Sequence, residues 1–174
     1  MKHLILMRHG SARTGEDDRE RPLSPEGVDE ARRMGRALAA LSARGFRPER
    51  ALVSPSRRTR ETLAGVREAL GSLVAGEEDE ALYLASAARL LARLRQLPDA
   101  TSQALVIGHN PGLVELVEQL VGRAEADVLL RAARGLAPAA CAALRIPTER
   151  WRELEPACAE LIAFLRPADA VVGE

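Results

Sequence analysis

Three short apolar runs, each followed at once by a polar motif that includes glycine or proline, constrain this fold more than any other feature of the sequence. They cover residues 3–7, 51–53 and 104–107. Uninterrupted apolar runs of this length are typical of strands that are buried on both faces of a parallel sheet. Segments with helical spacing of apolar residues lie between them. Strands that alternate with helices predict an α/β fold with a mainly parallel central sheet.

Four helices are expected, because capping residues stand in front of the apolar patterns of helical period. Serine and asparagine are common N-caps, proline is common at the first helical position, and glycine often ends a helix. The second helix should follow Ser54-Pro55 and carry Leu63, Val66 and Leu70. The other signals are Ser24-Pro25 at the start of the first helix, Gly45 at its end, Ser86 at the start of the third, and Asn110-Pro111 at the start of the fourth.

The remaining segments carry weaker patterns. The polar residues 11–22 and the acidic run 77–80 are typical of surface loops. Residues 139–146 and 151–155 predict a pair of strands at an edge of the sheet, joined through a proline turn. Residues 122–138 fit neither period clearly, and we assign them no element.

Length and composition favour one soluble domain over residues 1–174. A chain with 47% hydrophobic and 29% charged residues is not expected to be disordered. No apolar run reaches the roughly 20 residues of a membrane span, and the N-terminal run is too short for a signal peptide. Cys141 and Cys158 form neither a disulfide framework nor a metal-type spacing. We therefore expect a cytoplasmic protein with no membrane association.

The formal net charge is zero, but the charge is unevenly spread. The first 60 residues carry 14 Lys and Arg against 8 Asp and Glu, and 24 of the 25 basic residues are arginines. A guanidinium suits phosphate better than an ammonium does. With four aromatic residues in the whole chain and no overall positive charge, nucleic acid is not an expected partner.

Three polar motifs follow the predicted strands: residues 8–10, 54–58 and 108–111. In open α/β sheets the ligand site lies at the carboxyl ends of the strands, so these motifs should meet. Together they supply two histidines, at least two arginines and a helix N-terminus, which suit a compact anion such as phosphate. A neutral histidine can act as a nucleophile and carry a phosphoryl group. His3 lies inside a strand, and we expect it to be structural.

Other site types lack their signatures. The sequence contains no GxxxxGK[ST] loop and no GxSxG elbow. His9 and His109 have no neighbouring cysteine and no histidine at a metal-binding spacing, so no metal is expected.

Four segments of the chain form a recognisable set. They are Met7-Arg8-His9-Gly10, residues 21–27, Ser54-Pro55 with Arg58 and Thr62, and residues 105–112. In order and spacing they resemble the motifs of the histidine phosphatase superfamily, and the second is similar to its SixA-type phosphohistidine phosphatases. The resemblance extends from residue 4 to about residue 120. It implies a three-layer α/β/α, phosphoglycerate mutase-like fold in a compact form without large insertions.

The resemblance also implies a mechanism in which a histidine attacks phosphorus and forms a phosphohistidine intermediate. No metal or other cofactor is implied, because arginines neutralise the phosphoryl charge. Arg57 is an alternative to Arg58, but the family's spacing of four residues from Ser54 selects Arg58. The implied roles are His9 as the nucleophile and Arg8, Arg58 and His109 as the groups that hold the phosphoryl oxygens.

Two carboxyl groups are candidates for the proton donor. Asp18 precedes Arg21 by three residues, as in the SixA-type proteins, and we favour it. Glu80 is the alternative, since larger members place a glutamate before the third helix, but its surroundings do not match that pattern. A phosphoramidate leaving group has a protonatable nitrogen and depends less on such an acid.

The resemblance therefore implies a phosphatase that removes phosphate from phosphohistidine on a signalling or phosphotransfer protein. A small-molecule phosphomonoesterase on the same scaffold, or a non-catalytic module that binds phosphoproteins, are the alternatives. The sequence leaves the physiological substrate, the pathway and the oligomeric state open.

Overall fold

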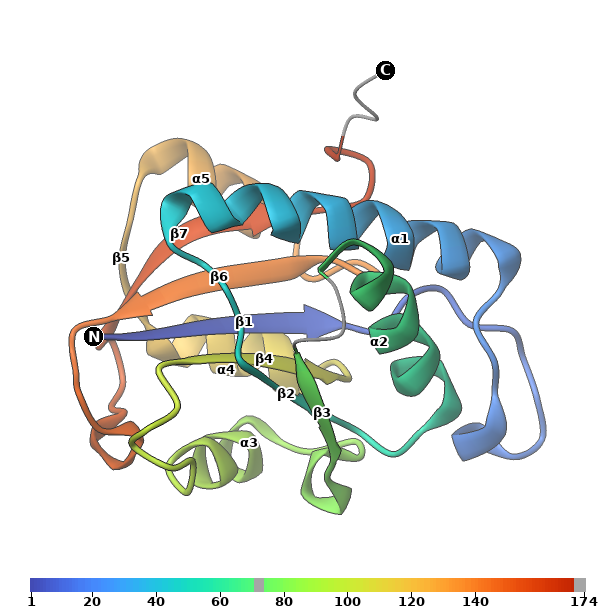
Figure 1. Ribbon diagram of the computed structural model, residues 1–174, viewed down its shortest axis with the longest axis horizontal. Helices are drawn as coiled ribbons and strands as arrows, with labels where there is room; N and C mark the ends of the chain where they lie inside the picture. Colours follow the sequence, from blue (N-terminus) through green and yellow to red (C-terminus); the bar gives the residue numbers. More distant parts are fainter. Residues whose placement is uncertain (71–73, 171–174) are drawn as a thin grey trace.

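The computed structural model describes residues 1–70 and 74–170, which form a seven-stranded sheet between two layers of helices (Figure 1). The strand order is β3-β2-β4-β1-β6-β7-β5. The strands are β1 (Lys2–Arg8), β2 (Arg50–Val53), β3 (Ala75–Glu78), β4 (Gln103–Gly108), β5 (Val121–Ala124), β6 (Cys141–Ile146) and β7 (Ala159–Leu165).

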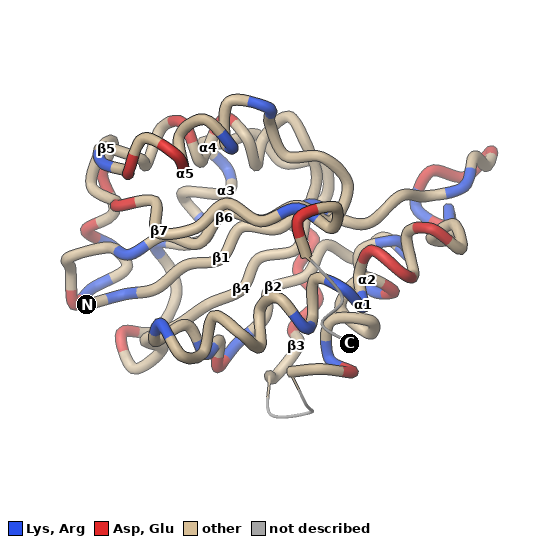
Figure 2. The backbone as a smooth tube through the Cα atoms, turned by 90° about the horizontal axis from the view of Figure 1, so that it is seen from above, with Lys and Arg blue, Asp and Glu red and all other residues tan. Residues whose placement is uncertain are grey.

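Helices α1 and α2 cover one face of the sheet, and α3, α4 and α5 cover the other (Figures 1 and 2). This arrangement confirms the expected three-layer fold. None of the helices in the described ranges is long and apolar enough to cross a membrane. The α-helices are α1 (Pro25–Ala40), α2 (Arg57–Leu70), α3 (Ala87–Leu94), α4 (Gly112–Leu120) and α5 (Ala126–Ala132). The 3-10 turns are η1 (Asp18–Glu20), η2 (Leu41–Arg44), η3 (Glu80–Leu82) and η4 (Trp151–Glu153).

Strand β1 explains why the apolar runs do not alternate with polar residues. Leu4 and Leu6 pack in the hydrophobic cluster beneath α3 and α4, whereas Ile5 and Met7 pack in the cluster beneath α1 and α2. Successive side chains of a strand point to opposite faces, so a strand covered on both faces must be apolar throughout. Accordingly, charged residues lie mainly on the helices and loops and at the strand ends (Figure 2).

The sheet is mainly parallel, as expected. Strands β3, β2, β4 and β1 run parallel to one another, as do β7 and β5, and β6 is antiparallel to both of its neighbours, β1 and β7. Met7 of β1 and Val53 of β2 both pair with Ile107 of β4. The carboxyl ends of these three strands are therefore level with one another at one edge of the sheet.

Capping residues fix the helix boundaries that the sequence predicted. The Ser24 hydroxyl accepts a hydrogen bond from the Gly27 N–H at 3.1 Å and caps α1. Ser86 caps α3 in the same way. After α1 the chain tightens into η2, which ends at Gly45 with a φ of 87°. Glycine adopts this left-handed conformation without the strain that a β-carbon would cause, so the predicted stop is confirmed.

The prediction of a loop over residues 77–80 was wrong for its first half. Glu77 and Glu78 belong to the edge strand β3, which pairs with β2 alone and is exposed. Arginines neutralise the acidic run, since Arg50 lies 2.8 Å from the Glu77 carboxylate. An edge strand tolerates charged side chains because one side faces water. Since β3 carries such charges, it has no apolar run by which the sequence could predict it.

The expected C-terminal strand pair was also partly wrong. Residues 141–146 form β6, but its second partner is β7 and it lies inside the sheet rather than at an edge. Residues 151–153 form the turn η4 instead of a strand. There the Trp151 side chain is buried, and its indole N–H donates to the Thr101 carbonyl at 2.7 Å. A turn that buries one large side chain can have the same hydrophobic pattern in the sequence as a short strand.

Most of the segment that the sequence left unassigned forms β5 and α5. Helix α5 buries only Val128, while Leu129 and Leu130 are exposed. A helix with one buried residue has no apolar stripe of helical period, so the sequence offered no signal for it.

Candidate active site

The site lies where strands β1, β2 and β4 end. His9, Ser54 and His109 each come directly after the last residue of one of these strands. Because the three strands are parallel neighbours, the loops that follow them meet at one edge of the sheet. The rings of His9 and His109 consequently lie 5.3 Å apart, centre to centre.

The His9 ring presents its Nε2 atom to the site. Its Nδ1 lies 2.7 Å from the Gly10 carbonyl oxygen. Because a carbonyl only accepts hydrogen bonds, Nδ1 carries the hydrogen and Nε2 keeps a lone pair. The Nε–H of Arg58 points to that Nε2 at 3.3 Å. A nucleophilic nitrogen therefore faces a permanent cation.

His109 is held from both ring nitrogens. Its Nε2 lies 2.7 Å from the Ser54 hydroxyl, and its Nδ1 accepts from an Arg58 Nη2 hydrogen at 3.3 Å. The side chain is buried, with 3% of its surface exposed. These contacts fix the ring beside Arg58.

Arg58 is the buried centre of the site, and Arg57 is not. The Arg58 side chain lies in the first turn of α2 and is 3% exposed. Its guanidinium contacts both histidines and Asp18. Arg57 instead forms an exposed ion pair with Glu61 at 2.7 Å. The count of four residues from Ser54 thus selects the arginine that faces the histidines.

Arg8 reaches the same region from the end of β1. Its Nη1 donates to the Leu136 carbonyl at 3.2 Å, and the Asn110 amide donates to the same oxygen at 2.8 Å. Asn110 was expected to cap α4, but Pro111 occupies the N-cap position and Asn110 makes no capping bond. Among the described residues, the buried Nε of Arg8 has no hydrogen-bond partner. Arg8 therefore keeps a donor for an anion.

Asp18 joins the site from η1. Its Oδ2 accepts from the Tyr83 hydroxyl at 2.6 Å and from Arg58 at 3.0 Å, and its Oδ1 accepts from Arg21 at 3.0 Å. The hydrogen bond from Tyr83 is the main reason that the pKa of Asp18 lies far below its usual range. At neutral pH this carboxylate is ionised and acts as an acceptor.

The hydrogen bonds of the Glu80 carboxylate lead to Arg19 and not to either site histidine. Both of its carboxylate oxygens accept from Arg19, at 3.1 and 3.0 Å, and the pair is exposed. This partner lowers the pKa of Glu80 below its ordinary value. The structure therefore brings His9, Arg58, His109 and Asp18 together and keeps Glu80 on the rim.

Almost the whole chain has relatives among known proteins. The profile of the histidine phosphatase superfamily (branch 1) matches residues 4–83. An uncharacterized protein of Mycobacterium tuberculosis (strain ATCC 25618 / H37Rv) is 30% identical over 165 residues, which cover 92% of this chain and 99% of that protein. The chain belongs to the histidine phosphatase superfamily.

Solved structures of SixA proteins are similar to this superfamily member. The provisionally assigned phosphohistidine phosphatase SixA from Nakamurella multipartitia is 29% identical, with a TM-score of 0.78 over 95% of this chain and 96% of that chain. The protein histidine phosphatase SixA complexed with tungstate is 25% identical, with a TM-score of 0.75 over 96% and 98%. Both likenesses confirm the fold that the sequence resemblance implied.

Burial and neighbouring charges keep both site histidines of this superfamily member neutral. Desolvation, together with the positive charges of Arg58 and Arg8, lowers the pKa of His9 to about 4. Desolvation likewise lowers the pKa of His109 to about 3, with added repulsion from His9 and Arg58. At neutral pH the site thus combines neutral imidazoles with two arginines. The His3 ring, by contrast, packs against the Phe46 ring with 4.7 Å between the ring centres, and His3 is not part of the site.

Two groups of the site carried no sequence signal. Tyr83 follows η3, and folding brings it into contact with Asp18 and His109, which are distant from it in the sequence. The Leu136 carbonyl holds Arg8 from the segment after α5, where any residue would supply the same oxygen. A signal for Ser54 existed, since it belongs to the second motif.

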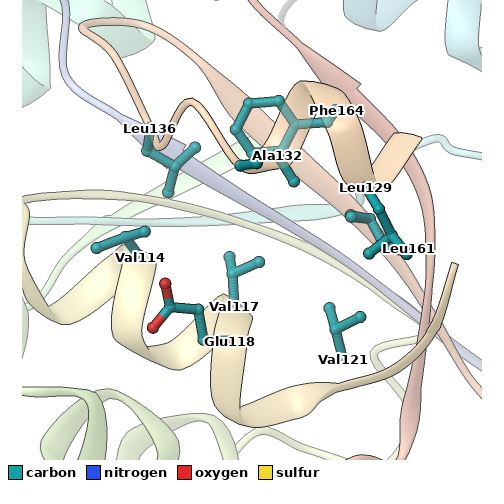
Figure 3. A pocket seen from close by; sticks show the side chains of 10 residues that line it. Val114, Val117, Glu118, Val121, Leu129, Ala132, Leu136, Leu161 and Phe164 are labelled. Carbon is teal, nitrogen blue, oxygen red and sulfur yellow. The ribbon is translucent and has the colours of Figure 1, made fainter. Parts of the chain in front are cut away.

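The Leu136 side chain also lines a crevice between α4 and α5 (Figure 3). The crevice has a volume of about 330 Å³ and a mainly apolar lining, and Glu118 stands at its rim. Val117, Leu136, Leu161 and Phe164 of this lining are buried, whereas the Leu129 side chain is exposed. Within the described chain, no cluster of three or more His, Cys, Asp or Glu side chains could hold a metal ion.

The electrostatics of the site predict an unusual titration of its histidines. We expect the His9 and His109 rings to titrate near 4 and 3, far below the usual value of about 6.5. Arg58→Ala should raise both pKa values, because it removes a positive charge and lets water in, whereas Arg57→Ala should leave them unchanged. Nitrogen-15 NMR of the histidine rings measures this. A His9 ring that titrates near its ordinary value in the wild type would contradict the burial argument.

Proposed function

We propose that this protein is a phosphohistidine phosphatase that acts through a phosphoryl group carried on His9. The observation that supports this most directly is the contact between the unprotonated Nε2 of His9 and Arg58, with His109 beside them. Membership of the histidine phosphatase superfamily and the likeness to SixA structures support the same chemistry.

In the proposed reaction, Nε2 of His9 attacks phosphorus in line with the leaving group. The bond from Nε2 to phosphorus forms as the bond to the leaving nitrogen breaks, and the Nδ1–H bond to the Gly10 carbonyl stabilises the charge that develops on the ring. Water then attacks the phosphohistidine, which releases inorganic phosphate and restores His9. Phosphoryl transfer needs mainly positioning and charge stabilisation on the equatorial oxygens, which we assign to Arg8, Arg58 and His109. His109 donates from Nδ1 in the tautomer whose Nε2 accepts from the Ser54 hydroxyl, once Arg58 has turned its Nη2 hydrogen to the phosphoryl group.

The ionised state of Asp18 favours a phosphohistidine substrate over a phosphate ester. An alkoxide leaving group needs a proton from the enzyme, whereas the imidazole of phosphohistidine can be protonated on its own nitrogen. The low pKa values of Asp18 and Glu80 leave neither as a ready acid at neutral pH. The cationic first third of the chain, with 14 basic against 8 acidic residues, would attract an acidic phosphotransfer domain.

Replacement of His9 tests its role as the nucleophile. His9→Ala should abolish turnover and leave the fold intact, because the lost group lies in a loop after β1. When the wild type is quenched in acid or in base with labelled substrate, a phosphoenzyme should survive base and be lost in acid. An acid-stable ester, or retained activity in His9→Ala, would refute the mechanism.

The second motif offers a matched pair of arginine variants. Arg58→Ala should lower kcat/KM on the order of 10²-fold, as expected for loss of a transition-state contact. Arg57→Ala removes the same charge from the neighbouring position, where it pairs with Glu61, and should change kcat/KM little. Equal losses in the two variants would show that Arg58 has no special role.

The substrate class is tested by competition between phosphoproteins and small molecules. We expect a higher kcat/KM for a phosphohistidine-bearing phosphotransfer domain than for p-nitrophenyl phosphate or a panel of sugar phosphates. Faster turnover of a sugar phosphate would favour a small-molecule phosphomonoesterase on the same scaffold. Binding of the phosphoprotein without any turnover would instead favour a non-catalytic module.

A further inference from the structure

Tyr83 stands out among the residues around the site because each part of its side chain has a defined contact. Its hydroxyl donates to Asp18 Oδ2 at 2.6 Å, and its ring meets the His109 ring edge-on at 5.6 Å. The Arg19 guanidinium lies 4.2 Å above the ring centre, and Arg19 is itself held by Glu80. These contacts join η1 to the segment that follows η3.

The backbone after Tyr83 is strained. Leu84 has a φ of 47°, in the left-handed region that residues with a β-carbon rarely adopt, and its side chain is exposed. Such strain persists only where the surrounding structure requires that conformation, and it is common near functional sites. The turn at Leu84 leads the chain from η3 into α3 and leaves the Tyr83 side chain over the site.

The two edges of the Arg58 guanidinium have different partners, and Asp18, which accepts from Tyr83, binds one of them. Nη1 donates to the Asp18 backbone carbonyl, and Nη2 donates to its carboxylate at 3.0 Å. The other edge, Nε with Nη2, points to His9 Nε2 and His109 Nδ1, both at 3.3 Å. One edge is therefore anchored on η1, while the other faces the two histidines.

We propose that Tyr83 is a positioning residue for phosphoryl transfer, acting through Asp18 to hold the Nε–Nη2 edge of Arg58 toward the phosphoryl oxygens. This rests on the proposed function, in which Arg58 binds those oxygens. It gives Asp18 the role of an ionised anchor in place of a proton donor. Without the Tyr83 hydroxyl, Asp18 Oδ2 loses one of its two donors, and the guanidinium is free to turn its forked edge away from the in-line geometry.

Tyr83→Phe isolates the hydroxyl because it keeps the ring that packs on His109 and Arg19. We expect kcat for p-nitrophenyl phosphate to fall about 10-fold, with a much smaller change in KM, since misaligned groups cost mainly transition-state stabilisation. Asp18→Asn should also lower kcat, while Asp17→Asn, a neighbouring variant with the same loss of charge, should not. Thermal melting checks that each variant is folded.

A double-mutant cycle separates positioning from a merely structural role. If Tyr83 acts through Arg58, Tyr83→Phe should have almost no further effect on kcat in the Arg58→Ala background. Equal losses in the two backgrounds, or an unchanged kcat in Tyr83→Phe alone, would overturn the proposal.

Binding of inorganic phosphate keeps this test independent of the proposed function. Calorimetry should show weaker phosphate binding in Tyr83→Phe than in the wild type, and no such difference between the two forms in the Arg58→Ala background. A wild type that binds phosphate but turns over no substrate would refute the proposed function, yet this cycle would still decide the role of Tyr83. Equal phosphate affinity in the wild type and Tyr83→Phe would count against it.

Discussion

The buried guanidinium of Arg58 is the contact on which the site depends. A charge in this position is costly unless every donor finds a partner, and the partners come from distant parts of the chain. They are Asp18 in η1, His9 after β1 and His109 after β4. Helix α2 places this guanidinium at the point where the parallel strands end. The packing of α2 on the sheet therefore also brings Arg58 to the partners that its burial requires.

The same burial sets the protonation of the histidines. Desolvation and the nearby arginines hold His9 and His109 neutral, and the hydrogen bond to Gly10 decides which nitrogen of His9 remains free. A neutral imidazole is a nucleophile, while a protonated one is not. The arginines that would bind an anionic phosphoryl group therefore also keep the attacking nitrogen available.

Sequence alone predicted the parts that local chemistry determines. His9 and His109 follow buried strands, which is a local signal. The spacing of four residues from Ser54 that the family resemblance implies distinguished Arg58 from its neighbour. Tyr83 was missed, since its contact with Asp18 spans 65 positions and depends on how two loops meet. The edge strand β3 and the helix α5 were missed because their burial is partial and their hydrophobic pattern is weak. Strand β7, the second partner of β6, is mostly buried, and it was missed although its residues are mainly apolar.

The acceptor for Arg8 is a main-chain carbonyl, that of Leu136. An oxygen of the backbone is the same whatever side chain its residue bears, so substitution at this position leaves the hydrogen bond chemically possible. An insertion or deletion in the segment after α5 would move the carbonyl and release Arg8. Comparisons of residue identity are blind to such a contact. Among homologous chains, a constant length of this segment would therefore indicate a preserved Arg8 contact better than constant residue identities would.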